Sequence, residues 1–218
     1  MGFVKAPSSA RRAGARAAGR PSAAQESLRD LRRNQIVAAA RTIVAAGGLE
    51  ALSFRTLEEK LGFTRGVITY HFEDKDEIVA ALLASAVAEI DAATTARVES
   101  ASSVQEKVRA VLQTKVRGFL EHPEAAEILI AFWARLGSGG PVQELMARLF
   151  AAYRAQSETL IKAARREAPR LAVDAPALAA LLVGMVIGLV VQVRFEPDAV
   201  AVEAALDEAE RMVLARLT

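Results

Sequence analysis

The chain has 218 residues, which is enough to bury a substantial core in one large domain or two small ones. It contains no cysteine, which excludes a disulfide framework and a thiolate metal site and suits a reducing cytoplasm. Hydrophobic residues make up 52% of the sequence, and the abundance of Ala and Leu favours helices over strands. We therefore expect an all-α, cytoplasmic protein of about nine helices.

Positive charge is concentrated near the N-terminus, although the whole chain carries a formal net charge of only +2. Residues 1–83 contain 13 Lys and Arg against 9 Asp and Glu, and residues 1–20 contain basic residues and no acid. That first segment is rich in Ala, Gly, Ser and Pro and cannot bury enough apolar surface to offset its ordering entropy. We expect residues 1–25 to form a disordered basic arm, which either follows DNA phosphates or stays a solvated tail.

The first predicted helix runs from Glu26 to Ala46. Ile36, Ala40 and Ile43 recur at intervals of four and three residues, which places them on one inward face. Two glycines directly after the helix predict its end. We expect this helix to be a scaffold for the elements that follow it.

Two short helices joined by a tight turn are predicted at the start of the stretch 52–78. Ser53 can cap the first helix, because its hydroxyl can accept a hydrogen bond from a free backbone N–H group. Gly62 stands where a helix C-terminus favours a left-handed residue, and Thr64 can cap the next helix two residues later. The connection is therefore expected to be a sharp corner.

The second of these helices, Arg65–Phe72, has an unusual outer face. Ile68 and Phe72 lie four residues apart and are expected to point inward. The remaining surface carries a mixture of cationic, aromatic and small side chains: Arg65, Gly66, Val67, Thr69, Tyr70 and His71. Such a face suits a helix-turn-helix, in which the second helix enters the major groove of DNA.

Three spaced motifs carry a family resemblance: LGFTRG at 61–66, YHF at 70–72 and DKDEI at 74–78. Together they resemble the N-terminal DNA-binding domain of TetR-family bacterial regulators, and the similarity covers Arg29 to Leu83. The resemblance implies a helix-turn-helix domain at residues 26–73, a homodimer and a palindromic double-stranded DNA operator. Where the family often has Tyr after the aliphatic residue of the second helix, this chain has Thr69, followed by Tyr70.

The next helix is predicted to begin at Asp74, whose side chain can cap it while Glu77 reaches back as in a capping box. Lys75 then lies on the first turn, where free N–H groups and the helix dipole already favour an anion. A DNA phosphate is the expected partner of this lysine. An ordinary solvent-exposed lysine is the alternative.

Ten residues are candidate DNA contacts: Ser53, Arg55, Thr64, Arg65, Gly66, Val67, Thr69, Tyr70, His71 and Lys75. We expect Arg55 and Lys75 to contact phosphates. Arg65 is placed to read a guanine edge, and Val67 suits a thymine methyl group.

Residues 74–218 are predicted to form a helical domain for ligand binding and dimerisation. The helix from Asp74 continues to Glu99, and a break at Ser102 and Ser103 starts the next. The further helices are expected at 103–120, 123–135, 141–168, 174–194 and 198–217. The Gly-rich sequence GSGGP at 137–141 is the clearest loop signal in this half.

The run Ala177–Val191 contains no polar side chain. A membrane span needs roughly 20 apolar residues, so we favour a buried or interfacial helix and expect no membrane partner. Gly184 and Gly188 leave a smooth strip for the close approach of another helix. By the resemblance, the last two helices form a four-helix dimer interface that includes Leu181, Gly184, Met185, Gly188, Val191, Leu206 and Val213.

The segment Ile128–Arg135 resembles the effector domain of the TetR branch that includes the choline-responsive betaine repressors. Large side chains that could line an effector cavity, with one polar candidate, are Phe119, Phe132, Trp133, Met146, Phe150, Tyr153, Met185 and Gln192. Each alone suits an ordinary core, whereas together they suit an apolar pocket. Gln113, Thr114 and Arg194 are further polar candidates, and no carboxylate is expected inside. The effector is therefore expected to be apolar or amphiphilic, and neutral or anionic in preference to cationic.

Catalysis has little support in the sequence. The chain has two histidines, one of them in the predicted recognition helix, and it has no HExxH motif or P-loop. We expect no catalytic residue, metal or cofactor. The sequence predicts a ligand-responsive transcriptional repressor, and a helical enzyme or a ligand-binding protein without an operator is the alternative.

Overall fold

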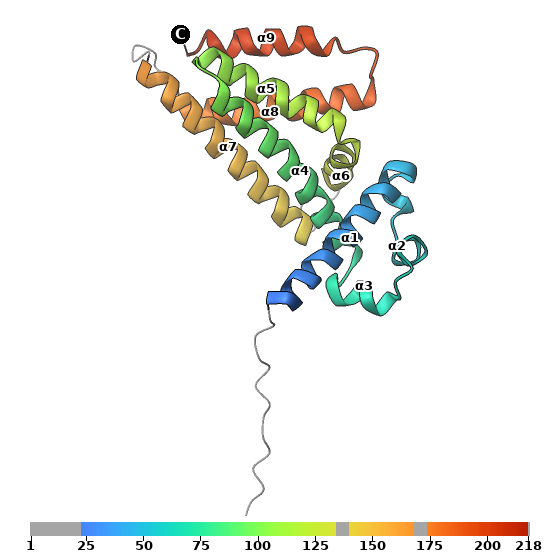
Figure 1. The fold of residues 1–218 in the computed structure, drawn as a ribbon. Helices are drawn as coiled ribbons and strands as arrows, with labels where there is room; N and C mark the ends of the chain where they lie inside the picture. The colour runs from blue at the N-terminus through green and yellow to red at the C-terminus, as the bar shows by residue number, and fades with distance from the viewer. Residues whose placement is uncertain (1–22, 134–139, 168–173, 218) are drawn as a thin grey trace, which may run out of the picture.

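The computed structural model describes residues 23–133, 140–167 and 174–217, and its regular elements within these ranges are all helical (Figure 1). The α-helices are α1 (Ala23–Gly47), α2 (Phe54–Leu61), α3 (Arg65–His71), α4 (Lys75–Ser100), α5 (Val104–Glu121), α6 (Pro123–Trp133), α7 (Pro141–Glu167), α8 (Ala175–Phe195) and α9 (Val202–Leu214). A short 3₁₀ helix, η1 (Leu49–Ala51), connects α1 to α2. The predicted all-α fold is confirmed. Residues 1–22 of the predicted arm and most of the predicted loop at 137–141 lie outside the described residues, whereas residues 23–25, also expected in the arm, are helical and belong to α1.

One predicted helix start is wrong. Asp198 was expected to begin the last helix, but α9 begins at Val202, and its N-cap residue Ala201 has no side-chain hydrogen bond. The preceding residues form a turn in which Ala199 N donates to Glu196 O over 3.1 Å. Pro197 lies inside this turn, and its fixed φ angle and missing N–H suit a turn better than a helix interior.

The N-terminal helices pack around α1. Ile36 and Ala40 on α1 are fully buried, as predicted, while Ile43 is partly buried. Ile68 of α3 and the following Phe72 complete this core, and both are fully buried. A long α1 therefore supports the short helices α2 and α3, and it also runs alongside the start of α4 (Figure 1).

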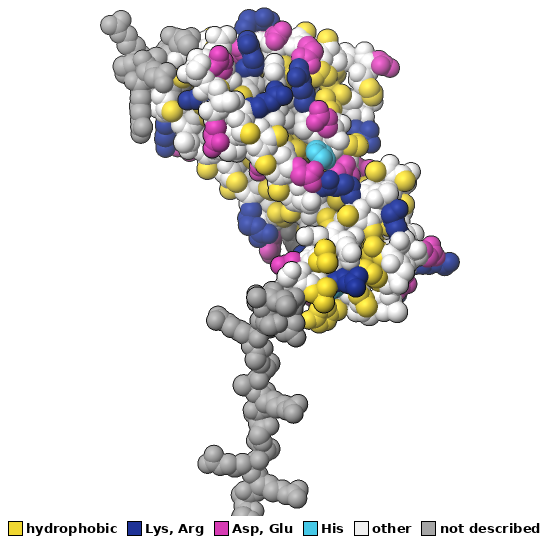
Figure 2. All heavy atoms as spheres, viewed as in Figure 1, with side chains coloured by type: hydrophobic (Ala, Val, Ile, Leu, Met, Phe, Trp, Pro, Cys, Tyr) yellow, Lys and Arg dark blue, Asp and Glu magenta, His cyan; other side chains and the backbone are white. Residues whose placement is uncertain are grey.

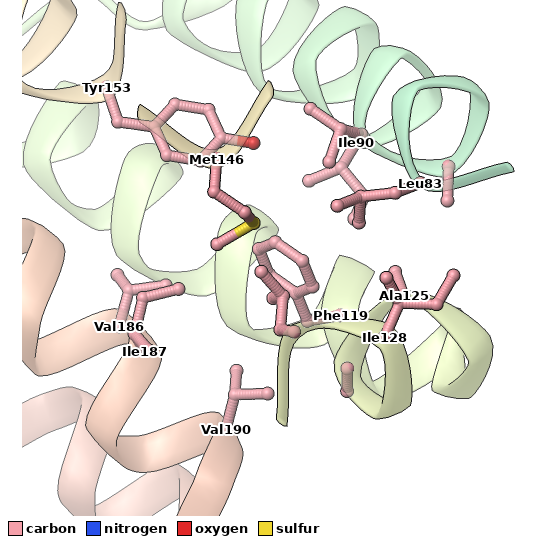
Figure 3. Close-up of a cluster of buried hydrophobic side chains, with 14 of the residues drawn as sticks. Leu83, Ile90, Phe119, Ala125, Ile128, Met146, Tyr153, Val186, Ile187 and Val190 are labelled. Atoms are coloured by element: carbon pink, nitrogen blue, oxygen red, sulfur yellow. The ribbon is translucent and has the colours of Figure 1, made fainter. Parts of the chain in front are cut away.

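The remaining helices form a bundle in which α4 packs against α5, and α7 against α8. Helix α9 covers α5 at the end of the bundle far from α1, while α6 lies between the bundle and the N-terminal helices (Figure 1). Phe119 and Ile90 belong to the cluster of buried side chains shown in Figure 3. The bundle thus has a continuous apolar core that reaches α6.

Two of the described helices, α4 and α8, are long and apolar enough to cross a membrane, judged by length and composition alone. Helix α4 carries its apolar residues into the core, where Ile78, Leu82, Ala86 and Ile90 are buried. Helix α8 is the more apolar of the two, yet only 28% of its most apolar stretch is buried. Much of its apolar surface is therefore left uncovered by the described residues of the single chain.

Candidate nucleic-acid interface and ligand cavity

Helix α2 is held by the predicted cap and one further residue. Ser53 Oγ accepts a hydrogen bond from Thr56 N over 3.1 Å, and Thr56 Oγ1 accepts one from Ser53 N over 3.0 Å. This reciprocal capping box confirms Ser53 as the cap, while the part of Thr56 was not predicted. Gly62 ends the helix with φ 65°, the left-handed conformation that glycine tolerates best. The Ser53 hydroxyl is therefore already engaged inside the protein.

Thr64 precedes α3 as its N-cap residue, but its side chain makes no capping hydrogen bond. The prediction that its hydroxyl caps the helix is therefore wrong. The backbone closes this turn instead, because Val67 N donates to Thr64 O over 3.0 Å. The Thr64 side chain is left exposed beside the first turn of α3.

The outer face of α3 is exposed along its length. Arg65, Gly66 and Val67 are exposed at its N-terminal end, and His71 is partly buried at its C-terminal end. Thr69 Oγ1 donates to Arg65 O over 3.0 Å, so this hydroxyl is turned back to the helix backbone. Tyr70, in contrast, is 70% exposed.

Arginines of α1 lie beside this face and contact residues of α3, and these contacts were not predicted. The guanidinium of Arg29 lies 5.7 Å from the ring centroid of Tyr70, and Arg33 donates to His71 O over 2.9 Å. Burial lowers the pKa of His71, and the charges of Arg29, Arg33 and Arg32 lower it further. His71 is therefore neutral at pH 7. Figure 2 shows basic and hydrophobic side chains side by side over this part of the surface.

The two predicted phosphate contacts differ in their surroundings. Arg55 is exposed and pairs with Glu59 one turn away, with 2.9 Å between Nε and Oε1. Lys75 is partly buried, and its Nζ donates to Leu49 O over 3.0 Å. Asp74 caps α4 as predicted, but Glu77 Oε2 accepts from Glu73 N rather than from the N-cap residue. Lys75 is therefore more than an ordinary solvent-exposed lysine.

A narrow apolar cavity lies among α5, α7 and α8. Its lining consists of Val111, Leu112, Lys115, Phe119, Tyr153, Gln156, Ser157, Leu182, Val183, Val186 and Ile187. The volume open to the centre of a water-sized sphere is only about 20 Å³, close to the room that a single water needs. In this conformation the cavity is nearly closed.

Two of the predicted ligand contacts, Phe119 and Tyr153, line this cavity. Met146 is buried in the adjoining core (Figure 3), while Phe150 and Met185 are only partly buried and pack against it. Gln192 is exposed, and its amide donates to Gly188 O over 3.3 Å. These four residues do not line the cavity in this conformation. The side chains of Phe132 and Trp133 lie outside the description.

A buried lysine is the main feature of the cavity that was not predicted. The side chain of Lys115 is only 5% exposed and pairs with Asp91 on α4. Its Nζ lies 4.1 Å from the ring centroid of Tyr153. The lining itself contains no carboxylate, as expected, and Asp91 pairs with Lys115 without being part of that lining. The missed signal is the position of Lys115 between Leu112 and Phe119 on the apolar stripe of α5.

The tyrosine hydroxyl at this group lacks a partner. Tyr153 Oη is buried and has no hydrogen bond within the described residues. Burial raises the pKa of Tyr153 above its ordinary value, and the charge of nearby Asp91 raises it further, so the phenol stays protonated. Burial also lowers the pKa of Lys115, while pairing with Asp91 opposes this change. Lys115 and the Tyr153 hydroxyl thus both lie near Asp91 at the cavity.

The predicted dimer residues fall into two groups. Leu181 is 63% exposed, and a Cβ atom added at Gly184 or Gly188 would meet no atom within 4 Å. Leu206 and Val213 are each only 2% exposed, because α9 packs them against the bundle. These two side chains are therefore buried within the single chain, and they leave little surface for a second copy. Met185 and Val191 are partly buried.

Comparison with protein families supports both halves of this arrangement. The family model for bacterial regulatory proteins of the tetR family matches residues 36–82, and that for the C-terminal domain of BetI-type transcriptional repressors matches residues 104–218. The chain belongs to the TetR family. Both parts of the resemblance seen in the sequence are thereby confirmed. Among the described residues of this TetR-family chain, no cluster of His, Asp or Glu is placed to hold a metal ion.

Two curated relatives match the N-terminal part. The HTH-type transcriptional repressor AcnR of Corynebacterium diphtheriae is 40% identical over 63 residues, which are 28% of this chain and 33% of that protein. An HTH-type transcriptional repressor of Mycobacterium tuberculosis is 43% identical over 51 residues, which are 23% of this chain and 27% of that protein. The similarity therefore spans a third or less of each relative.

Solved structures of similar fold cover nearly the whole chain. A TetR-family transcriptional regulator from Pectobacterium atrosepticum has a TM-score of 0.71 and 24% identity, covering 88% of this chain and 97% of that chain. A transcriptional regulator from Saccharomonospora viridis in complex with choline has a TM-score of 0.72 and 16% identity, with coverages of 84% and 96%. The fatty acid degradation regulator FadR of Bacillus halodurans has a TM-score of 0.69 and 14% identity, with coverages of 84% and 94%. At these identities the likeness concerns the fold.

Proposed function

We propose that this TetR-family protein is a homodimeric repressor that binds a palindromic operator and is released from it by a small molecule. The observation that carries the proposal is the exposed face of α3, held outward by the fully buried Ile68 and Phe72. A short helix with buried anchors and an exposed cationic N-terminal end suits insertion into the major groove. Arg65 is the proposed reader of a guanine edge, and Val67 the proposed contact to a thymine methyl group.

The exposed small and aromatic residues of α3 support a close fit to DNA. Gly66 has open space around it, since a Cβ atom there would meet nothing within 4 Å. No neighbour in the protein requires a glycine at this position, whereas a closely approaching DNA strand does. Tyr70 is the better DNA contact of the pair with Thr69, because the Thr69 hydroxyl is already bound to the helix backbone.

The exposed face of α8 supports dimerisation. It is apolar, carries Leu181, and is smooth at Gly184 and Gly188, so a second copy of the same helix can approach closely. A two-fold pair of such helices buries this face and fixes the separation of the two recognition helices. A separation of about 34 to 36 Å matches successive major grooves on one side of the duplex.

Release by a ligand follows from the nearly closed cavity. A ligand larger than a water molecule has to move α5, α7 or α8 apart in order to enter. It therefore binds the widened conformer better than the closed one, and it releases DNA only to the extent of that difference in affinity. The proposed domain boundary, residues 26–73 for DNA and 74–218 for ligand and dimer, separates the two sites.

The relative in complex with choline suggests one ligand class, which the cavity of this chain disfavours. A quaternary ammonium ion is often held over aromatic rings. Here the Lys115 ammonium already lies over the Tyr153 ring, so the cavity contains its own cation. A second cation at this place would meet repulsion at short range.

Selection of DNA by the purified protein tests the proposed function. Random double-stranded DNA is bound, recovered and sequenced over several rounds. We expect an inverted repeat whose half-sites lie about one helical turn apart. Absence of any enriched repeat, from protein that sediments as a folded dimer, would contradict operator binding and favour a ligand-binding protein without an operator.

A further inference from the structure

The polar group at the cavity points to a definite ligand chemistry, and this inference rests on the proposed effector function. Lys115 on α5 and Tyr153 on α7 line the cavity, and Asp91 on α4 pairs with Lys115 without lining it. The remaining lining is apolar apart from Gln156 and Ser157. An ordinary core gains little from a buried ammonium group even when it is paired, because removing the charges from water can cost more than their attraction returns. The arrangement therefore calls for a functional explanation.

The two partners of this ion pair differ in their exposure. The Lys115 side chain is 5% exposed, whereas that of Asp91 is 41% exposed. Asp91 can therefore exchange its protein partner for water at small cost, while Lys115 needs an anion in place. Of the two, Asp91 is the one that another anion can replace.

A hydroxyl donor is available at the same place. Tyr153 Oη is buried beside the cavity and, among the described residues, has no hydrogen bond of ordinary geometry, although Asp91 lies close enough to raise its pKa. Its phenol stays protonated, so it can donate to an acceptor inside the cavity but offers no negative charge to a cation. A carboxylate that entered the cavity would find the Lys115 ammonium and the Tyr153 hydroxyl together.

We infer that the effector is an amphiphilic carboxylic acid whose carboxylate replaces Asp91 as the partner of Lys115 and accepts a hydrogen bond from Tyr153. Its apolar body lies along the walls formed by Leu182, Val186 and Ile187 on α8. A neutral alcohol of the same shape gains the hydrogen bond but not the charge pairing. A cation of the same shape meets the Lys115 ammonium.

Head-group series with three different apolar bodies test this assignment. Calorimetric titration of the full-length protein compares octanoate with 1-octanol and octyltrimethylammonium, phenylacetate with 2-phenylethanol, and cyclohexanecarboxylate with cyclohexylmethanol. For at least one body, the acid should bind about tenfold or more tightly than its alcohol, as one charge-assisted hydrogen bond provides. If no acid is preferred over its alcohol, or if the ammonium ligand binds best, the assignment is overturned.

Variants that should change acid binding in opposite directions distinguish an effect on the ligand site from a loss of folding. Lys115→Met should abolish the preference for the acid while alcohol binding persists, and Tyr153→Phe should weaken acid binding. Asp91→Asn should tighten acid binding, because the competing carboxylate is removed. Lys107→Met is the matched control, since Lys107 lies two turns earlier on α5 and does not line the cavity. Weaker acid binding in Asp91→Asn would overturn the exchange of partners.

The outcome is independent of operator control. Release of operator DNA by the preferred acid is measured separately, on DNA obtained by the selection described above. An acid that binds through Lys115 but leaves the operator complex intact would support the ligand class and remove effector control from the proposed function. If only the alcohols release the operator complex, the proposed repressor function stands, but the assignment of a carboxylic acid as the ligand is overturned.

Discussion

The residues of the proposed DNA surface differ in how much of their hydrogen-bonding capacity the protein itself uses. The Ser53 hydroxyl caps α2, and the Thr69 hydroxyl donates to the backbone of α3. Their position on this surface therefore overstates what they can offer to DNA. Arg65 lies with its guanidinium 5.2 Å from the ring centroid of Phe54, a contact that also pre-orders its side chain. A pre-ordered arginine loses less conformational entropy when it meets a base.

Replacement of Arg65 by alanine should reduce specific binding by about 1 to 3 kcal/mol, because a bidentate contact to guanine is lost. Preference should relax at a single position in each half-site, since one side chain reads one base pair. Competition binding with operators mutated one position at a time measures both effects. An equal loss on every DNA sequence would reassign Arg65 to a phosphate.

Alanine variants of Lys75 and Arg55 should have the same effect on the salt dependence of DNA binding but different effects on folding. Removal of either proposed phosphate contact by alanine should flatten the log–log dependence of binding on salt by about one unit. Lys75→Ala should also lower the free energy of unfolding, because the carbonyl of Leu49 loses one of its two donors and keeps only Leu52 N, whereas Arg55→Ala should leave folding nearly unchanged because Arg55 is exposed. Salt titrations and urea denaturation measure the two effects. An unchanged salt slope for Lys75→Ala would make its role purely structural.

At the scale of elements, the sequence predicts best what neighbours along the chain decide. Ser53, Gly62, Ser103 and Asp174 mark helix ends correctly, since a cap is satisfied within three or four residues of itself. The element that covers an apolar helix face is not determined by residues nearby in the sequence. The apolar stripe of α9 was assigned to a second copy, but it packs on α5 of its own chain. An amphipathic pattern predicts an apolar face but does not identify the element that packs against it.

The cavity was less predictable than the fold for the same reason. Aromatic and Met residues were singled out by type, and an apolar residue at helical spacing can lie either in the core or at a cavity wall. The pairing of Lys115 with Asp91 joins residues 24 positions apart, and no local spacing encodes it. The distinguishing local signal was a charge inside an apolar stripe.

The packing of α9 gives a stability prediction. Leu206→Ala should lower the free energy of unfolding by about 2 to 5 kcal/mol, because it removes a buried side chain and leaves a cavity against α5. The protein should still sediment as a dimer where it is folded. Urea denaturation measures the loss, and Met212→Ala, at an exposed position on the same helix, is the control. A loss confined to dimerisation would restore Leu206 to the interface.

At the scale of the whole molecule, dimerisation is expected to depend on the open face of α8. Gly188→Arg places a long charged side chain where a Cβ atom meets nothing in the single chain, so the monomer fold should tolerate it. In a closely packed pair of helices the same side chain would cost several kcal/mol. Sedimentation at low concentration should therefore show monomers. A dimer of unchanged stability would exclude this face as the interface.

One residue, Leu49, is hydrogen-bonded to both α4 and α6 through its backbone. Leu49 N donates to Glu127 Oε1 on α6 over 2.7 Å, and Leu49 O accepts from Lys75 Nζ on α4 over 3.0 Å. Gly48 next to it has φ 73°, and a Cβ atom there would lie 3.0 Å from the Glu127 carboxylate. The turn before the helix-turn-helix is thus held by α4 and α6, and α6 in turn packs against α5 and α8 beside the cavity.

Loss of the Glu127 carboxylate should weaken the coupling between ligand and operator. The coupling free energy in such proteins is typically about 1 to 3 kcal/mol, and it is reciprocal between the two ligands. Glu127→Ala should therefore reduce, by the same factor, the effect of ligand on operator affinity and the effect of operator on ligand affinity. Titrations of each ligand with and without the other measure both factors.

Two variants serve as controls for this prediction. Glu127→Gln keeps an acceptor oxygen and should lose less of the coupling, and Glu121→Ala, at an exposed position on α5, should change neither factor. A coupling factor unchanged in Glu127→Ala would mean that the two sites communicate by another route, because the hydrogen bond to Leu49 N would then be only structural.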